Sequence, residues 1–273
     1  MLFRSLGVKE TAVTFPAALL LWEIFSGGNL KSAWRLQWSS WLLLGVSALF
    51  FLLHDGYVRL VQNSMQLNDF SGNVATQIQA FVYLLHQWFF PLWLNIDPDL
   101  PVLHGFAGLL PHMLILTLLA WLMLWSWHRR PWLSFALAWT FLQLLPLYLF
   151  LPRMDVANER QFYLLSWPLA LAVMVELSLW LKAKVFIVIS AGLLVLLASL
   201  TLLRNQQYHS EIALWEATAK VSPAKARVQN NLGYAYMIAG RNEEAGLAFS
   251  KALHLDPNYY QSHFNLQRLM SLD

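Results

Sequence analysis

Two neighbouring pairs of opposite charge stand out in a chain that otherwise carries little charge. Lys9 and Glu10 precede the first apolar stretch, and Glu159 and Arg160 lie in a polar break between two later stretches. Ammonium and guanidinium groups bind phosphate oxygens, and an adjacent carboxylate can orient them. Both pairs are therefore candidates for binding an anionic ligand. The alternatives are a Lys9 side chain that only extends to a membrane interface and an ordinary charged loop around Arg160.

A pair of carboxylates, Asp97 and Asp99, flanks a proline. Paired carboxylates can hold a divalent cation or act in acid–base chemistry, although a solvated turn has the same composition. The histidines show no spacing typical of metal ligands, and the chain has no cysteine that could supply a thiolate. The sequence therefore identifies a possible acidic site and leaves the catalytic residues unknown.

The composition places these residues in a membrane protein. Of the 273 residues, 58% are hydrophobic and only 12% are charged, whereas ordinary soluble domains have about 25% charged residues. The net charge of +3 is scattered along the chain, so there is no basic stripe for nucleic acid. The bilayer is the natural solvent for such a chain and is its first expected partner.

About 20 mainly apolar residues cross a bilayer as a helix. The sequence predicts an all-α fold with six spans, and residues 76–95 are too rich in Gln and His for a simple seventh. We expect that segment to be re-entrant or interfacial, where protein or water covers its polar groups. The six spans are residues 11–25, 38–53, 108–127, 131–151, 161–181 and 185–203.

Basic residues in short loops predict the orientation of the spans. With 76–95 re-entrant, the three basic loops at 26–37, 128–130 and 182–184 share the cytoplasmic face. Loops 54–107 and 152–160 and both termini then face outward. All the candidate site residues lie on this outer face.

Residues 204–273 are polar and follow the membrane domain of residues 1–203. Several residue types recur 34 positions apart, as in Pro223 and Pro257, which is the period of tetratricopeptide repeats (TPRs). One full repeat is predicted at about 227–260, between half repeats at 208–221 and 259–272. Such modules usually bind a protein or peptide. The residues expected to pack it are Trp215, Leu232, Gly233, Tyr236, Gly240, Ala245, Phe249, Ala252 and Pro257.

Four segments, in this order, resemble the C-terminal half of a bacterial glycosyltransferase of the polytopic GT-C type with TPRs, and the transmembrane and TPR-containing O-mannosyltransferases. They are Lys9 to Pro16, Thr76 to Leu94, Asn158 to Leu164, and Trp215 followed by the repeat. The resemblance implies transfer of a sugar from a polyprenyl-phosphate donor to a protein or glycan, on the periplasmic face of a bacterial inner membrane. It also implies a divalent cation, with Lys9 and Arg160 contacting the donor phosphate and Glu10 and Glu159 orienting them.

The chain departs from that family in one respect. The family's acidic catalytic motif follows its first span, and that region is upstream of anything in this sequence. We therefore expect this chain to be part of a longer enzyme or a non-catalytic subunit. The alternative function is a membrane scaffold that docks a partner through its TPR. A polysaccharide ligase or polymerase is less favoured, because loop 54–107 has Arg59 as its only Arg or Lys, besides His54, His86 and His104.

Overall fold

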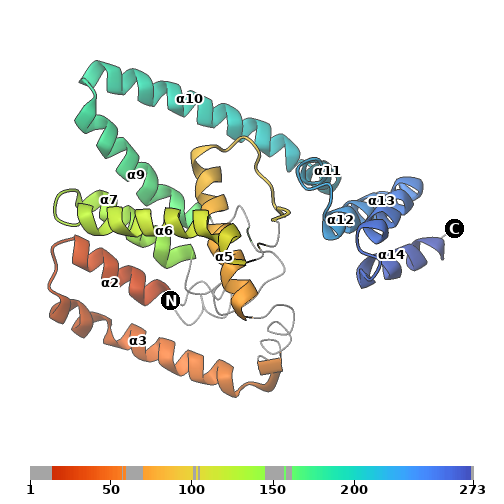
Figure 1. Cartoon of the computed structure of the whole chain (residues 1–273), viewed down its shortest axis with the longest axis horizontal. Helices are drawn as coiled ribbons and strands as arrows, with labels where there is room; N and C mark the ends of the chain where they lie inside the picture. The colour runs from red at the N-terminus through yellow and green to blue at the C-terminus, as the bar shows by residue number, and fades with distance from the viewer. Residues whose placement is uncertain are drawn as a thin grey trace. The chain divides into compact units, whose positions relative to one another are not determined.

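A computed structural model describes residues 14–56, 58–59, 70–100, 103, 105–144, 157 and 162–271 (Figure 1). Within these ranges the regular elements are all helices, with no strand, as the sequence predicts. The chain divides into two compact units. Unit 1 consists of residues 1–88, 102–156 and 160–183, and unit 2 of residues 89–101, 157–159 and 184–273.

Each predicted span of unit 1 contains a helix. The helices of this unit are α2 (Phe15–Phe25), α3 (Leu30–Leu53), α5 (Phe70–Phe89), α6 (Gly105–Ser126), α7 (Pro131–Leu144) and α9 (Phe162–Trp180). Helix α3 begins at Leu30 and so includes most of the predicted loop 26–37. Of the helices described in this unit, α6 alone is long and apolar enough to cross a membrane, judged by length and composition, and in unit 2 the same holds for α10 (Ala183–Gln207). Segment 76–95, expected to be re-entrant or interfacial, is helical as far as residue 89.

Helix α7 is the centre of unit 1, with α2, α6 and α9 packed against it. The Ser126 and Ser134 hydroxyls are 2.7 Å apart where α6 turns back into α7. The Thr14 hydroxyl donates to Gln143 Oε1 at 3.3 Å, so the start of α2 lies near the end of α7. Trp167 of α9 contacts the Trp139 ring at a centroid distance of 5.3 Å. The three neighbours of α7 are therefore antiparallel to it.

The three predicted basic loops of unit 1 come together at one end of this bundle. Phe25, at the end of α2, contacts the ring of Trp127 in the α6–α7 turn, with centroids 4.7 Å apart. Arg130 in the same turn pairs with Glu176, one turn before the end of α9. Trp132 and Trp180 also donate to the Glu176 carboxylate, at 2.9 and 3.3 Å. One acidic side chain thus joins the α6–α7 turn to the end of α9.

Unit 2 contains α10 and four shorter helices, which we call the C-terminal module: α11 (Glu211–Val221), α12 (Ala226–Ile238), α13 (Asn242–Leu255) and α14 (Tyr260–Met270). The α11 helix begins at Ser210, whose hydroxyl accepts from the amide of Ala213 at 3.1 Å, a standard N-cap. The module's helices pack in sequence order, and α12 also contacts α14. Helices lie at both predicted half repeats, 208–221 and 259–272, and α12 and α13 occupy the predicted full repeat at 227–260, whereas the TPR type of the repeat stays a prediction.

The residues predicted to pack the module lie mainly at its core. Ala245, Phe249 and Ala252 are fully buried, and Leu232 is nearly so. A Cβ atom at Gly233 would lie 2.7 Å from two ring carbons of Phe249, so α12 and α13 approach closely because this residue is glycine. Gly240, in the turn, has a φ of +74° that favours glycine. Of the other predicted packing residues, Trp215 and Tyr236 are partly buried and Pro257 is exposed.

Candidate functional site

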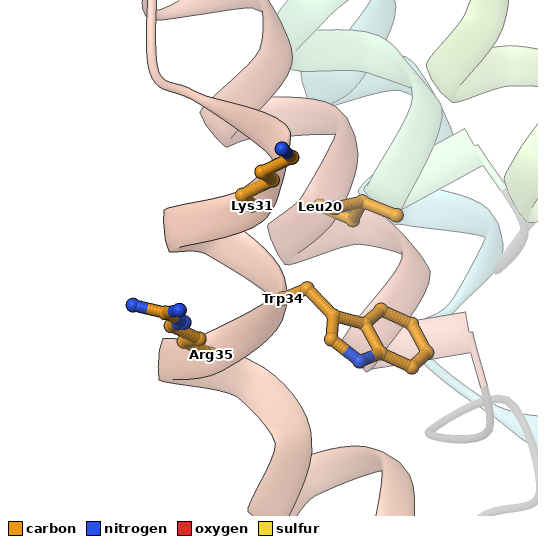
Figure 2. Close-up of a pocket in the computed structure, with 4 residues that line it drawn as sticks. All are labelled: Leu20, Lys31, Trp34 and Arg35. Carbon is orange, nitrogen blue, oxygen red and sulfur yellow. The ribbon is translucent and has the colours of Figure 1, made fainter.

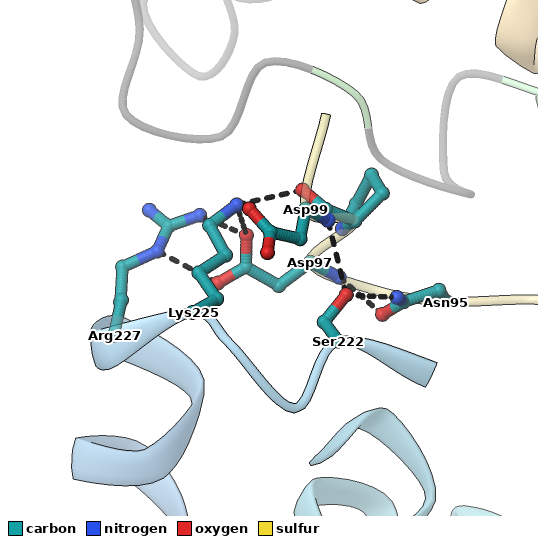
Figure 3. Close-up of polar contacts among 7 residues, drawn as sticks. Asn95, Asp97, Asp99, Ser222, Lys225 and Arg227 are labelled. Carbon is teal, nitrogen blue, oxygen red and sulfur yellow. Dashed lines mark hydrogen bonds and ion pairs between the residues drawn. The ribbon is translucent and has the colours of Figure 1, made fainter. Parts of the chain in front are cut away.

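The strongest polar cluster in unit 2 joins residues 95–99 to the start of the C-terminal module (Figure 3). Residues 90–100 follow α5 and form no regular helix. Residues 222–225 form the turn between α11 and α12. Asp97 and Arg227 are 130 positions apart in the sequence, yet their side chains form an ion pair. We call this cluster the loop–module site, made of Asn95, Asp97, Pro98, Asp99, Ser222, Lys225 and Arg227.

Asp97 lies at the centre of the loop–module site and is only 3% exposed. Lys225 Nζ donates to Asp97 Oδ1 at 2.6 Å and to the Pro98 carbonyl oxygen at 2.7 Å. Arg227 Nε donates to Asp97 Oδ2 at 2.7 Å, and Arg227 Nη2 also donates to Oδ1. A buried carboxylate needs such partners, because an unpaired buried charge is costly. Two cations therefore hold one carboxylate.

Ser222 holds the rest of the 95–99 segment. Its buried hydroxyl accepts from Asn95 Nδ2 at 2.7 Å and from the backbone amide of Asp99 at 3.0 Å. The side-chain Oδ1 of Asn95 accepts from the backbone amide of Asp97 at 3.0 Å, which is an Asx turn. The module thus recognises this segment through its backbone as well as its carboxylate.

Tyr259, at the start of α14, lies near the same charges. Burial raises the pKa of its phenol, the Arg227 guanidinium opposes that rise, and the Asp97 carboxylate adds to it. Behind the site, a buried polar network joins α12 to α14. Ser262 and Asn265 both donate to Asn230 Oδ1 at 3.0 Å. These bonds fix α14 relative to the helix that carries Arg227.

The structure tests the predicted acidic site but not the predicted phosphate site. Lys9, Glu10, Glu159 and Arg160 lie outside the described residues, so their role as a phosphate site stays a prediction. Asp97 and Asp99 are close together, but both oxygens of Asp97 accept from cationic side chains. This arrangement does not suit a divalent cation, and we derive no metal chemistry from it. The Asp99 side chain is exposed.

The cationic half of the site is what sequence reasoning missed. The 34-residue offset that identifies the repeat rests on matched pairs such as Pro223 and Pro257, and neither Lys225 nor Arg227 belongs to such a pair. Asp97 was identified as an acidic residue, but no local pattern links it to residues more than 120 positions away. The only available signal was an acidic Pro-containing loop and a basic pair at the start of a helix in the same chain.

Comparison of this chain with protein-family models, with characterised proteins and with solved structures finds no match.

Proposed function

We propose that this chain is a polytopic membrane protein with a TPR-type binding module. The module lies on the side of the membrane opposite the basic turns, which are the parts of the chain around residues 26–37, 128–130 and 182–184. The module binds an extended acidic segment of a partner protein. The observation that carries the proposal is the loop–module site, where the module already holds one extended segment through a carboxylate and backbone groups. Main-chain recognition combined with one charged anchor is a general way to bind peptides.

The membrane topology is supported by contacts inside each unit. Contacts such as those of Phe25 with Trp127 and of Arg130 with Glu176 bring the basic turns to one end of unit 1, as the positive-inside rule requires of cytoplasmic loops. In unit 2, Asp97 contacts Arg227, so residues 95–99 and the module share one side of a bilayer. Between residues 95–99 and the module, the chain passes through α6, α7, α9 and α10. Four crossings return the chain to the side of the bilayer from which it started, because four is an even number.

The topology can be tested directly, because the chain has no cysteine. Single-cysteine variants Ser26→Cys, Arg129→Cys and Lys182→Cys place a thiol at each basic turn, and Lys251→Cys places one on an exposed position of α13. A membrane-impermeant maleimide should label position 251 in intact cells and the other three only after permeabilisation. Labelling of all four positions on one side would contradict the proposal.

Partner binding is tested by photocrosslinking in the membrane. Tyr234 of α12 and Tyr260 of α14 are 40% and 72% exposed, and each can be replaced by a benzophenone amino acid. We expect a discrete protein adduct at one or both positions and none at exposed Lys251 on α13. Equal adducts at all three positions, or adducts that a saturating acidic peptide does not reduce, would contradict a specific binding face.

Glycosyl transfer is a second candidate function, favoured by the interior of unit 1. Helix α5 buries the amide side chains of Asn73, Gln77 and Gln79. Sugar hydroxyls and phosphates need such donors and acceptors inside an otherwise apolar unit. The test is transfer of a sugar from a polyprenyl-phosphate donor by the reconstituted chain, alone and with the protein encoded next to it. Activity that survives Lys9→Ala combined with Arg160→Ala would contradict the predicted donor site.

A further inference from the structure

A shallow cavity of about 450 Å³ lies between α2 and α3 in unit 1, lined by Leu20, Lys31, Trp34 and Arg35 (Figure 2). In the figure, Trp34 and Lys31 lie on the side of α3 near Leu20, and the Arg35 guanidinium extends from the other side. Lys31 and Arg35 are four residues apart, so their charges lie about one helical turn from each other along α3. Lys31, Trp34 and Leu20 therefore lie on one side of the cavity, and Arg35 adds a second cation one turn further along α3.

The two cations of this cavity have no carboxylate partner among the residues that the structure describes. Neither Lys31 nor Arg35 forms an ion pair within the described residues. Glu23 is the acidic residue of α2, and its side chain lies against Gly28 in the α2–α3 turn. Glu176, the other carboxylate near this end of the bundle, is paired with Arg130. The cavity is therefore a cationic site without a carboxylate of its own.

We infer that this cavity binds the phosphate of an anionic phospholipid. Lys31 contacts the phosphate, Arg35 adds charge at the same level, and Trp34 and Leu20 contact the glycerol and the first acyl carbons. Trp side chains favour the membrane interface for this reason, and basic pockets between helices on the cytoplasmic side bind anionic headgroups. The inference rests on the membrane part of the proposed function and assigns the lipid class that its basic face recognises.

The test uses the full chain reconstituted into nanodiscs of phosphatidylcholine containing a minor fraction of phosphatidylglycerol. Native mass spectrometry then counts the lipids that stay bound to the released protein. We expect the unmodified chain to retain phosphatidylglycerol in preference to phosphatidylcholine. Lys31→Ala combined with Arg35→Ala should reduce that preference about thirtyfold, because two basic groups near a membrane surface, at roughly 1 kcal/mol each, contribute about 2 kcal/mol together.

The matched control is Arg129→Ala combined with Lys182→Ala, which removes two cations from the neighbouring basic turns and leaves the cavity intact. This control should keep most of the preference, and excess inorganic phosphate should not displace the lipid. An equal loss in both variants would show diffuse attraction and overturn the site, as would full retention by the Lys31 and Arg35 variant. A failed headgroup site leaves the cysteine-labelling pattern intact, whereas a chain that does not span the membrane changes that pattern.

Discussion

Helix α10 has no buried residue along its 25 positions, whereas the C-terminal module that follows it buries Phe249, Ala245 and Ala252 completely. Both belong to unit 2, but their sequences differ in kind. The α10 segment is apolar on every side, which is typical of a helix that faces lipid. The module alternates apolar and polar positions with helical period, so each helix has one face to bury and one to leave in water. The exposed surface of α10 is therefore apolar, whereas the module combines a buried apolar core with polar exposed faces.

The largest effect on stability is expected from creating a cavity in the core of the C-terminal module. Phe249→Ala removes a fully buried ring that packs against Gly233, and such a change costs about 3–5 kcal/mol of stability. Hydrogen exchange of the full chain in nanodiscs should show lost protection in α12 and α13 and unchanged protection in α10. Leu247→Ala is the control, because Leu247 is on the same helix and 72% exposed. Equal losses from both variants would mean that this core does not hold the module together.

The next effect tests the other side of the comparison. Leu194 of α10 is 69% exposed, and a lysine there should be tolerated in water, within about 0.5 kcal/mol. In a bilayer the same change costs about 3 kcal/mol at the centre of a span. We expect Leu194→Lys to lower the fraction of chain that resists alkaline extraction, with Leu247→Lys in the module as the matched control. Equal resistance to extraction in the two variants would contradict the interpretation that α10 faces lipid.

A smaller effect is expected at the loop–module site. Asp97→Ala leaves Lys225 and Arg227 without their carboxylate, but their side chains remain about 20% exposed and partly hydrated. We therefore expect a cost of about 2 kcal/mol, below the usual range for a fully buried pair. Hydrogen exchange should increase in residues 95–99 and 222–227, whereas Asp99→Ala, at an exposed carboxylate, should leave both segments unchanged. Unchanged exchange in the Asp97 variant would show that the ion pair does not hold the loop.

The helices could be predicted from the sequence because their causes are local. Uniform apolarity predicted α6 and α10, and the 34-residue offset predicted the helical repeat whose packing residues include Gly233 and Phe249. The loop–module site has no such cause, since the contact of Asp97 with Arg227 depends on how segments 130 positions apart fold back on each other. The pairing of Glu176 with Arg130 is similar: the sequence shows a lone acid in an apolar helix, but its partner emerges only from the antiparallel packing of α7 and α9. Polar partners were therefore harder to predict than helices.

The smallest effect concerns the phenol of Tyr236 on α12. Burial and the hydrogen bond to Glu216, 2.7 Å long, raise the pKa of Tyr236 to about 12. Because the folded state favours the protonated phenol, its contribution is complete below pH 10 and is lost as the pH rises through 12. Tyr236→Phe should cost about 1 kcal/mol at neutral pH and should remove the latest phase of tyrosinate absorbance in an alkaline titration. A tyrosinate titration that is the same in both proteins would mean that Tyr236 ionises like an exposed phenol and that the Glu216 bond is absent. The corresponding control is Tyr234→Phe on the same helix, whose exposed ring should leave that late phase in place.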